Sequence, residues 1–290
     1  MLDDLIIRRM QVTDLAFAAQ CTANEGWASE TLASFEGFYQ HDPEGCLLAE
    51  RGGHPVGICI ATAYGHAGFV GELIVRPEVR GQGIGAALLN RATAYLHERG
   101  AATVYLDGVV KATPLYERHG FRKVCRSLRF SGALAGSQNP HVRRMQAGDL
   151  PSVFALDRQA FGADRSFFLA YRLRLFPELC HVMIEGDRLK GFIPGRRGES
   201  WTAAGPWVMT RHVMAHRARD SVGLLASLAN AAGVASISIG VLETHHNAVE
   251  LIRSLGFTLR EDSPWRMALG PSSDLGASPH CFAVGTAAKG

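Results

Sequence analysis

The sequence contains a glycine-rich turn whose residue types suit the binding of a phosphate group. The turn is Arg80-Gly81-Gln82-Gly83-Ile84-Gly85, and it stands between an apolar run typical of a strand and an alanine- and leucine-rich run typical of a helix. Glycines allow a tight bend close to a ligand, and the first amides of a helix have no partner within that helix. The helix dipole and the guanidinium of Arg80 both favour an anion here. A plain connection between strand and helix is the alternative, and the turn alone does not decide between the two.

The segments around this turn predict the elements that position it. Alternating apolar residues, caps and turn residues predict strands at 46–50, 56–64, 69–75 and 103–109, helices from Gly83 to about Arg99 and from Pro114 to His119, and an extended segment at 122–130. Residues 132–140 are rich in Gly, Ser, Asn and Pro and predict a linker.

Length and composition narrow the class of protein. A chain of 290 residues is long enough for two domains, and 47% hydrophobic with 20% charged residues is typical of globular proteins. A net charge of +3 without a basic tract argues against nucleic-acid binding, and no run is apolar enough to span a membrane. Scattered cysteines and histidines show no metal-ligand spacing, so no metal is expected. The acidic start, Met1-Leu2-Asp3-Asp4, does not resemble a signal peptide, so a cytoplasmic location is expected.

The chain also repeats itself. The segment Ile7–Leu15 recurs 135 residues later as Val142–Leu150, with the same Arg, Arg, Met, Gln, Asp and Leu in the same places. A second match, 136 residues apart, joins His119-Gly120-Phe121 to Leu255-Gly256-Phe257. Repeats of this length indicate two copies of one fold. We therefore expect domains at 1–132 and 141–290, joined by a linker at 133–140.

Two motifs of the first half resemble those of the GNAT superfamily of acyl-CoA-dependent N-acetyltransferases. Val75–Gly85, followed by an amphipathic helix, is similar to its Arg/Gln-x-x-Gly-x-Gly/Ala signature, and Pro114–Phe121 to its Leu-Tyr-x-x-x-Gly-Phe signature. The whole chain resembles a tandem-domain subgroup with a diverged second GNAT domain, through Glu25-Gly26-Trp27, Asp42-Pro43-Glu44-Gly45 and Leu106-Asp107. The resemblance implies an α/β (α+β) fold, with a mixed, mostly antiparallel sheet in each domain. That sheet is flanked by helices and splays between its fourth and fifth strands.

The resemblance further implies acetyl-CoA as co-substrate of the first domain. The amides of the glycine turn would hold its pyrophosphate, and the backbone of Leu73 to Val75 would pair with its pantetheine arm. Many members carry Asn before the tyrosine of the second motif, whereas this chain has Lys111-Ala112-Thr113-Pro114, where Thr113 substitutes only in part. The implied cofactor-binding residues are Leu73, Ile74, Val75, Arg80, Gly81, Gln82, Gly83, Ile84, Gly85, Ala86, Thr113 and Tyr116.

Transfer of an acetyl group to an amine sets two chemical demands. The amine is protonated at neutral pH and must lose a proton before it attacks, and the departing thiolate must gain one. Glu72, on the expected fourth strand, is the candidate base, and Tyr116 stands where the superfamily has its general-acid tyrosine. The alternatives are an ordinary polar strand residue for Glu72 and a packed core tyrosine for Tyr116.

Four residues fall in segments where family members build the acceptor site: Glu25, Trp27, Tyr64 and Asp107. An acidic residue beside aromatic rings would suit a cationic amine. Asp107 could equally cap a helix, and Trp27 could serve only as a packing anchor. The sequence names no particular acceptor.

The second copy lacks the features that carry this chemistry. An offset of 136 places Arg219 opposite Gly83, Ser221 opposite Gly85 and Ile252 opposite Tyr116. We therefore expect the second domain to keep the fold without the chemistry and to be structural, or to lend Asp164, Arg165 or Trp207 to the acceptor site. The predicted function is transfer of an acetyl group to a primary amine of a small molecule or peptide by a monomer or homodimer. The alternatives are a non-catalytic acyl-CoA-binding sensor and an interaction protein that has only inherited the fold.

Overall fold

The computed structural model describes residues 4–27, 31–137, 139–198, 201–210, 218–233, 236–271, 275–286 and 290. Its contacts divide the chain into two compact units. Unit 1 holds residues 4–124 and takes in 267–271, and unit 2 holds residues 125–266, 275–286 and 290. Each unit is described by itself below.

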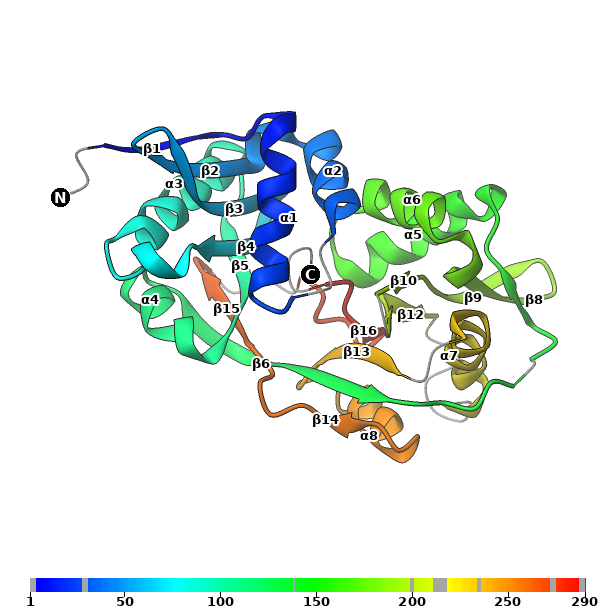
Figure 1. Cartoon of the computed structure of the whole chain (residues 1–290). Coiled ribbons are helices and arrows are strands. Elements are labelled where there is room, and N and C mark those ends of the chain that lie inside the picture. Colours follow the sequence, from blue (N-terminus) through cyan, green and yellow to red (C-terminus); the bar gives the residue numbers. More distant parts are fainter. Residues whose placement is uncertain are drawn as a thin grey trace. The chain divides into compact units, whose positions relative to one another are not determined.

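Unit 1 is a mixed sheet with helices on both faces (Figure 1). The strands lie in the order β1-β2-β3-β4-β5, all antiparallel except the β4–β5 pair, and the 267–269 part of β15 (Trp265–Leu269) joins beyond β5. The elements are β1 (Leu5–Arg9), α1 (Leu15–Asn24), α2 (Leu32–His41), β2 (Cys46–Arg51), β3 (His54–Tyr64), β4 (Ala67–Val75), α3 (Ile84–Glu98), β5 (Thr103–Gly108) and α4 (Thr113–Arg118). The predicted strands and helices are confirmed, with ends that shift by two residues or fewer.

Helix α3 packs closely on the sheet because glycines of β3 and β4 make room for its leucines. A Cβ at Gly57 would lie 3.2 Å from Leu88 Cδ1, and one at Gly68 would lie 2.7 Å from Leu96 Cδ2. Leu88 and Leu96 are fully buried, so these contacts belong to the core. They fix the start of α3, and with it the glycine turn, relative to β4.

Strands β4 and β5 pair along only part of their length. Their parallel ladder runs from Ala67 opposite Thr103 to Val70 opposite Leu106, although β4 continues to Val75. Opposite β3 the register shifts between Ile58 and Ile60, which marks a bulge in β4. Beyond Val70 the edge of β4 that faces away from β3 is therefore open.

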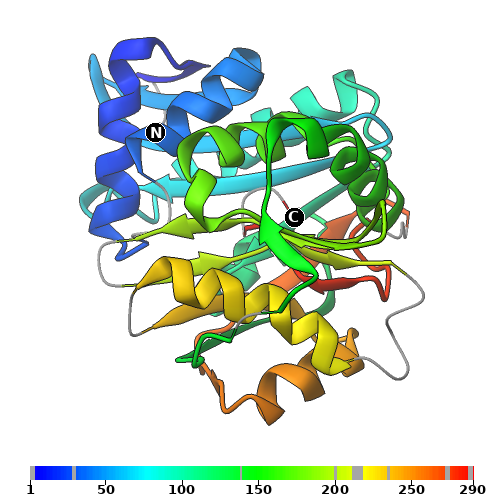
Figure 2. The same ribbon diagram turned by 90° about the vertical axis from the view of Figure 1, so that its right-hand side faces the viewer.

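Unit 2 repeats this plan, with its sheet strands between α5 and α6 on one face and α7 on the other (Figure 2). One sheet has the order β16-β12-β9-β8-β7, and a second group has the order β6-β13-β11-β10, with β14 beside β6. The elements are β6 (Arg122–Gly132), β7 (Val142–Arg144), α5 (Leu150–Phe161), α6 (Ser166–Leu175), β8 (His181–Glu185), β9 (Arg188–Ile193), β10 (Gly195–Arg197), β11 (Thr202–Ala204), β12 (Trp207–Met209), α7 (Ala218–Ala232), β13 (Ile237–Leu242), α8 (His246–Ser254), β14 (Thr258–Leu259) and β16 (Cys281–Ala283).

The same local structure opens both copies. In unit 1 the Arg8 guanidinium donates to both oxygens of Asp14, at 2.7 and 3.2 Å, and Asp14 accepts from the backbone of Gln11. In unit 2 Arg143 donates to Asp149 at 2.7 Å twice, and Asp149 accepts from the backbone of Gln146. The repeated sequence thus encodes a repeated ion pair and helix cap.

The compact units depart from the expected division at 132 and 141. Residues 125–132 of β6 belong to unit 2, because that strand pairs with β13 from Ser127 opposite Leu242 to Gly132 opposite Ile237. Residues 267–271 belong to unit 1, where Pro271 accepts a hydrogen bond from the hydroxyl of Thr103 at 2.6 Å. Each unit therefore contains a segment from the other half of the sequence.

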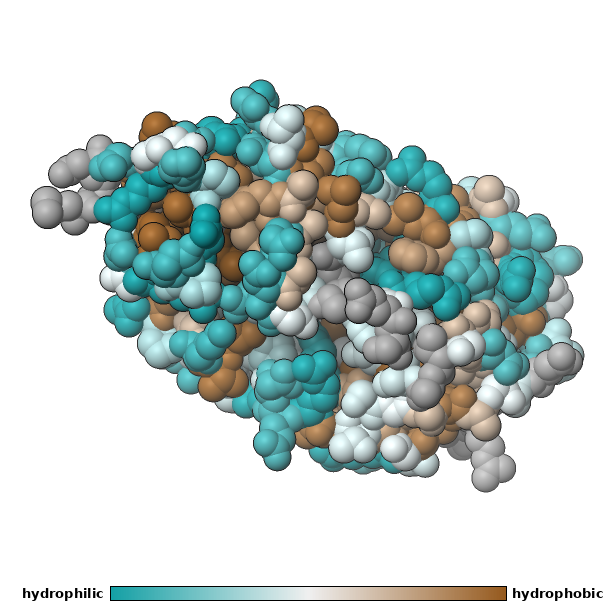
Figure 3. Space-filling model, in the orientation of Figure 1, coloured by the Kyte–Doolittle hydropathy of each residue, from teal (hydrophilic) through white to brown (hydrophobic). Residues whose placement is uncertain are grey.

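The surface mixes polar and apolar side chains. On the face shown in Figure 3, hydrophobic residues form separate patches among hydrophilic ones. The large apolar side chains that are exposed are Ile6, Val12, Leu32, Val110, Val124 and Leu259. Among the residues described, no helix is long and apolar enough to cross a bilayer.

Candidate functional site

The glycine turn has the backbone geometry of an anion cradle. Gly81 and Gly83 have φ values of 78° and 84°, in the left-handed region that side-chain-bearing residues avoid. Gly83 caps α3, whose first residue is Ile84 and whose first turn carries no acidic residue. The turn therefore places bare backbone and the positive end of a long helix at one point.

The open edge of β4 runs directly into this turn. Arg76 N–H donates to Val56 O on β3, so by alternation the carbonyl of Val75 points to the opposite edge, where Arg80 Nε donates to it at 2.8 Å. Leu73 faces the same edge, whereas Ile74 pairs with Ile58 of β3. Of the three residues predicted to pair with a pantetheine arm, Leu73 and Val75 have the orientation that pairing requires, and Ile74 does not.

Glu72 lies at the bulge in β4. It has a φ of 48°, and it is the non-glycine residue with positive φ in the described part of the chain. Its side chain is 9% exposed. Burial raises the pKa of the Cys59 thiol on β3, and the Glu72 carboxylate raises it further, so the two groups are within electrostatic range. A carboxylate held by a strained backbone at the point where two strands part is a functional candidate by its geometry.

Tyr116 is held in a fixed position on α4. It is 7% exposed, and its ring meets the ring of Phe121 edge-on with centroids 6.1 Å apart. A Cβ at Gly108, the last residue of β5, would lie 2.6 Å from Tyr116 Cε2, so that glycine makes room for the ring. Burial raises the pKa of Tyr116, and Cys59 raises it further. The phenol is therefore protonated at neutral pH and able to donate.

Gly108 and Cys59 were not among the predicted site residues. Gly108 could have been noticed in the sequence, because it is a glycine at the end of the strand that precedes the tyrosine motif. Cys59 could be found only through the strand register that sets it opposite the bulge.

Thr113 is the first residue of α4 and is 5% exposed. Its Oγ1 is buried without a hydrogen-bond partner. A buried hydroxyl usually has a partner, because leaving it without one costs about 1–3 kcal/mol. The orphaned hydroxyl supports the predicted role of Thr113 as a ligand contact.

Glu25 connects the predicted acceptor segment with the glycine turn. Its carboxylate is 12% exposed and forms ion pairs with Arg80 and, at 3.4 Å, with Lys111. Two cations thus neutralise the carboxylate, which weakens its attraction for a cationic amine. Trp27 is half-buried beside it, with its amide bonded to Thr22 O at 2.9 Å. Within the turn itself, Gln82 accepts a hydrogen bond from Arg51.

The other two predicted acceptor residues lie in different places. Asp107 is half-buried near the end of β5, one residue before Gly108. Tyr64 is buried at the far end of β3, opposite Ala67. Ala67 is five residues before Glu72, roughly 16 Å along an extended strand. The structure does not bring Tyr64 to the group formed by the turn, Glu72 and Tyr116.

The corresponding cleft of unit 2 is filled by the chain itself. Strand β16 pairs with β12, with Trp207 opposite Ala283 and Val208 opposite Cys281. Just beyond it Val284 N–H donates to Gly240 O of β13 at 2.9 Å. Residues 281–284 therefore occupy the space between β12 and β13, the counterparts of the end of β4 and of β5.

The residue types at this second cleft are also different. The pairs Gly57–Val75 and Gly191–Met209 match at an offset of 134, so Pro206 stands where unit 1 has Glu72. The match of the Gly-Phe motifs places Ile252, fully buried in α8, opposite Tyr116. Neither replacement can transfer a proton.

The predicted counterparts of Gly83 and Gly85 lie close to the edge of the described residues. An offset of 136 places Arg219 opposite Gly83 and Ser221 opposite Gly85. The described part of α7 begins at Ala218, and Ser221 is fully buried. Residues 211–217 and the side chain of Arg219 lie outside the described residues. Neither counterpart is a glycine.

Three side chains of the second domain were expected as contributors to the acceptor site, and two of them lie in the core of unit 2. Trp207 is fully buried against Phe282, and Arg165 is 4% exposed and bonded to Asp157 at 2.8 Å. Asp164 is exposed and pairs with Arg158 at 2.6 Å. In the described part of the chain, no cluster of His, Cys, Asp or Glu could hold a metal ion.

Both halves match models of one protein family. The model described as the acetyltransferase (GNAT) family matches residues 12–121, and the model of an acetyltransferase (GNAT) domain matches residues 153–281. The chain therefore belongs to the GNAT acetyltransferases, with one GNAT domain in each half.

Curated relatives match part of the chain. A mycothiol acetyltransferase of Stackebrandtia nassauensis is 35% identical over 125 residues, 40% of this chain and 40% of that protein. One of Acidimicrobium ferrooxidans is 33% identical over 120 residues, 39% of this chain and 38% of that protein. The chain thus matches about two fifths of the length of these relatives.

Solved structures share the fold over the whole chain. A putative acetyltransferase from Pyrococcus horikoshii has a TM-score of 0.82 at 23% identity and covers 100% of this chain and 97% of its own. A tandem GNAT protein from the clavulanic acid biosynthesis pathway has a TM-score of 0.62 at 14% identity, over 93% of this chain and 100% of its own.

Proposed function

We propose that this protein is an N-acetyltransferase that transfers the acetyl group of acetyl-CoA to a primary amine in the cleft of unit 1. The observation that carries the proposal is the edge of β4 after Val70, which β5 leaves open and which leads straight into the glycine turn. That edge offers the backbone of Leu73 and the amide of Val75, and the turn offers the amides at the start of α3. The orphaned hydroxyl of Thr113 adds a third polar contact.

Acetyl-CoA supplies an activated thioester, and the residues of the chain move the protons. Glu72 accepts a proton from the ammonium group, directly or through water, so that the free amine attacks the thioester carbonyl. Tyr116 gives its proton to the departing thiolate, and the phenolate regains one from solvent. Burial raises the pKa of the phenol, which keeps Tyr116 protonated but also makes it a weaker acid, and it leaves Glu72 little exposed to water.

The acceptor is a primary amine of a small molecule or peptide. Because these matching relatives are named mycothiol acetyltransferases, the acceptor of a mycothiol acetyltransferase belongs in the panel. The pairing of Glu25 with Arg80 and Lys111 favours Glu72 and Asp107 over Glu25 as the carboxylates that meet the amine. Unit 2 then has a structural role, and a cytoplasmic monomer or homodimer is in keeping with this function.

Two measurements test the proposal. Acetyl-CoA raises the melting temperature of the full chain, because a ligand that binds only the folded state stabilises it. Release of the CoA thiol is then followed over a panel of amines, polyamines, aminoglycosides, amino acids and peptides. No thermal shift at saturating acetyl-CoA contradicts the proposal.

The variant Tyr116→Phe separates an enzyme from an acyl-CoA sensor. For an enzyme, loss of the hydroxyl lowers kcat roughly 10²- to 10⁴-fold and leaves the affinity for acetyl-CoA nearly unchanged. For a sensor there is no turnover to lose, and acetyl-CoA binding alone remains. Equal loss of binding and turnover would show that Tyr116 is only structural.

A further inference from the structure

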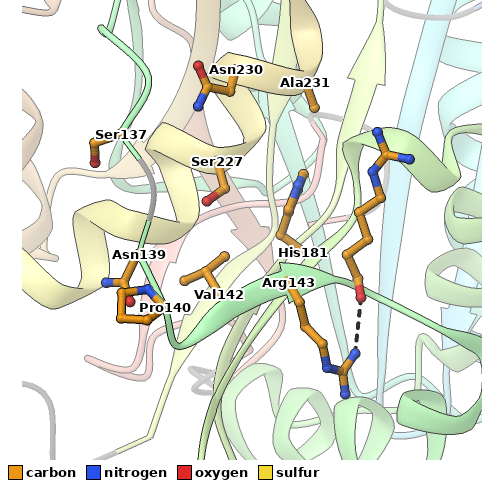
Figure 4. Close-up of a pocket in the computed structure, with 10 residues that line it drawn as sticks. Ser137, Asn139, Pro140, Val142, Arg143, His181, Ser227, Asn230 and Ala231 are labelled. Atoms are coloured by element: carbon orange, nitrogen blue, oxygen red, sulfur yellow. Dashed lines mark hydrogen bonds between the residues drawn. The ribbon is translucent and has the colours of Figure 1, made fainter.

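Unit 2 has a polar pocket on the side of its sheet that faces α7 (Figure 4). Its volume is about 790 Å³, within the range of pockets for small molecules. The lining comes from β7, β8, the second half of α7 and the segment before β7: Ser137, Asn139, Pro140, Val142, Arg143, Arg144, His181, Ser227, Asn230 and Ala231. The pocket does not involve β12, β13 or β16, so it is separate from the filled cleft.

The register of β7 and β8 places two basic side chains on the face toward α7. Val142 is opposite Met183 in a core cluster shared with α7, and Arg144 is opposite His181, two residues along on each strand. Residues two apart on a strand share a face. Arg144 and His181 therefore form a directly opposed cross-strand pair beside α7.

Arg143 faces the other way. Its strand partner Val182 lies in the core cluster under α5, and its guanidinium is bonded to both oxygens of Asp149. Figure 4 shows the Arg143 side chain pointing away from Ser227 and Asn230. Its charge is used within the fold, and Arg144 supplies the charge of the pocket.

His181 is a buried polar side chain with one ring nitrogen unsatisfied. It is 5% exposed, and its Nδ1 has no hydrogen-bond partner. Figure 4 shows the ring pointing from β8 toward the end of α7. Burial lowers the pKa of His181, a backbone hydrogen bond with Leu179 acts in the opposite direction, and the charge of Arg144 lowers the pKa further, which places Arg144 and His181 within electrostatic range.

The segment before β7 closes the pocket through two close glycine contacts. A Cβ at Gly136 would lie 1.6 Å from Asn230 Oδ1, and one at Gly223 would lie 2.6 Å from Asn139 Nδ2. The amides of both asparagines thus lie at the contact between this segment and α7. Ser227 adds a hydroxyl, and no Asp or Glu is among the ten lining residues described.

We propose that this pocket binds a small metabolite that carries an oxyanion, a carboxylate or a phosphate, with Arg144 as its charged partner and His181, Ser227 and Asn230 as polar contacts. A guanidinium beside neutral polar side chains, with no carboxylate among the described lining residues, is the donor set that such an anion requires. Unit 2 has then kept a ligand site of its own although its acyl-CoA cleft is filled.

Isothermal titration of the full chain with inorganic phosphate and with citrate, at fixed ionic strength, tests this. Coenzyme A is present throughout, so that the glycine turn of unit 1 does not contribute to the signal. At least one probe gives saturable binding. The variant Arg144→Gln weakens it by at least about tenfold, because a charge-assisted contact is lost. Arg188→Gln removes the same charge from an exposed site on β9 outside the pocket and changes binding by no more than about twofold.

A second variant tests the pocket independently, in case Arg144→Gln disturbs the fold. His181→Gln replaces the imidazole with a neutral amide and weakens binding of the same probe, while near-ultraviolet circular dichroism confirms that the fold is intact. The tighter of the two probes identifies the class of oxyanion. Absence of saturable binding by either probe at millimolar concentration, or equal weakening by Arg144→Gln and Arg188→Gln, overturns the proposal. Neither outcome depends on whether unit 1 transfers an acetyl group.

Discussion

The two GNAT domains of this chain share one plan and differ at the place where the fourth and fifth strands part. In unit 1 that gap is open along β4 after Val70, and it is followed by a glycine turn. In unit 2 residues 281–284 fill it and hydrogen-bond to both sides. The splayed sheet leaves unpaired backbone groups that must be satisfied. Unit 1 leaves such groups available along β4, whereas unit 2 satisfies them with its own chain.

The filling of the second cleft is accompanied by matching changes in the backbone around it. A Cβ at Gly205 would lie 2.4 Å from Val284 O, and one at Gly240 would lie 2.8 Å from Val284 Cγ2. Glycines at these two positions leave room for residues 281–284, just as the glycines of the turn in unit 1 would leave room for a phosphate. The comparison teaches that a GNAT sheet can keep its fold when a segment of its own chain occupies the gap between the parted strands.

The largest expected effect comes from removing the proposed base. Glu72→Gln keeps the size of the side chain and removes its proton affinity, so kcat falls roughly 10²- to 10⁴-fold in the thiol-release assay. The control, Glu78→Gln, removes an exposed carboxylate six residues away and leaves kcat unchanged. Full activity of the Glu72 variant would assign the proton transfer to another group.

The segment that fills the second cleft is the next point to test. Phe282 is 4% exposed, with its ring 5.1 Å from that of Trp207. Phe282→Ala lowers the free energy of unfolding by about 3–5 kcal/mol, because it leaves a cavity in the core. Calorimetry measures the loss, and titration with acetyl-CoA shows no added site. A new site in this variant would mean that β16 alone keeps the second cleft from binding.

The glycine turn can be tested against a glycine with the same backbone strain elsewhere. Gly81 and Gly53 have φ values of 78° and 77°, and a Cβ added at either would meet no atom within 4 Å. Alanine at either costs about 1 kcal/mol of stability. Only Gly81→Ala also weakens acetyl-CoA binding, by about tenfold, since Gly81 belongs to the turn proposed to hold the phosphates. Equal affinities of the two variants would remove the turn from the site.

The ion pair at the start of both copies is expected to have the same kind of effect on stability in each domain. Arg8 and Arg143 hold the pKa values of Asp14 and Asp149 below the usual range. A lowered carboxyl pKa contributes stability that is present above about pH 4 and is lost as the pH falls through the folded value. Arg8→Met costs about 1 kcal/mol at pH 7, and Arg143→Met costs less than about 1 kcal/mol, because Arg143 is the more exposed of the two arginines. In both variants the melting temperature falls less steeply with pH in the acid range than it does in the wild type. A melting temperature with the wild-type dependence on pH would show that these ion pairs do not contribute to stability.

The sequence predicted the local elements of unit 1 well because their signals are local. Gly83 and Gly100 mark the ends of a helix, and the apolar run at 56–64 marks a strand that is buried along nearly its whole length. Glu72 and Tyr116 were identified through motifs of fixed spacing, and the structure adds the bulge and Gly108, which depend on register. Tyr64 was grouped with the acceptor residues because its segment builds the acceptor site in family members, but it lies at the far end of β3, opposite Ala67.

Long-range pairing was beyond what the sequence could show. Nothing in residues 281–284 indicates which strands they join, because a short apolar run fits many edges. The assignment of β6 to unit 2 likewise follows from its partner β13, more than a hundred residues later. The alignment of Arg219 and Ser221 with the glycines of the turn stays a prediction, because residues 211–217 before α7 lie outside the described residues.

The central claim is that the chain has one acyl-CoA site and that it lies in unit 1. Isothermal titration of the full chain with acetyl-CoA counts the sites. The account predicts one per chain in the wild type and none in Gly83→Val, whose β-branched side chain cannot adopt the left-handed conformation at the cap of α3. The control Gly53→Val keeps one site. Two sites in the wild type, or one that survives in Gly83→Val, would contradict it.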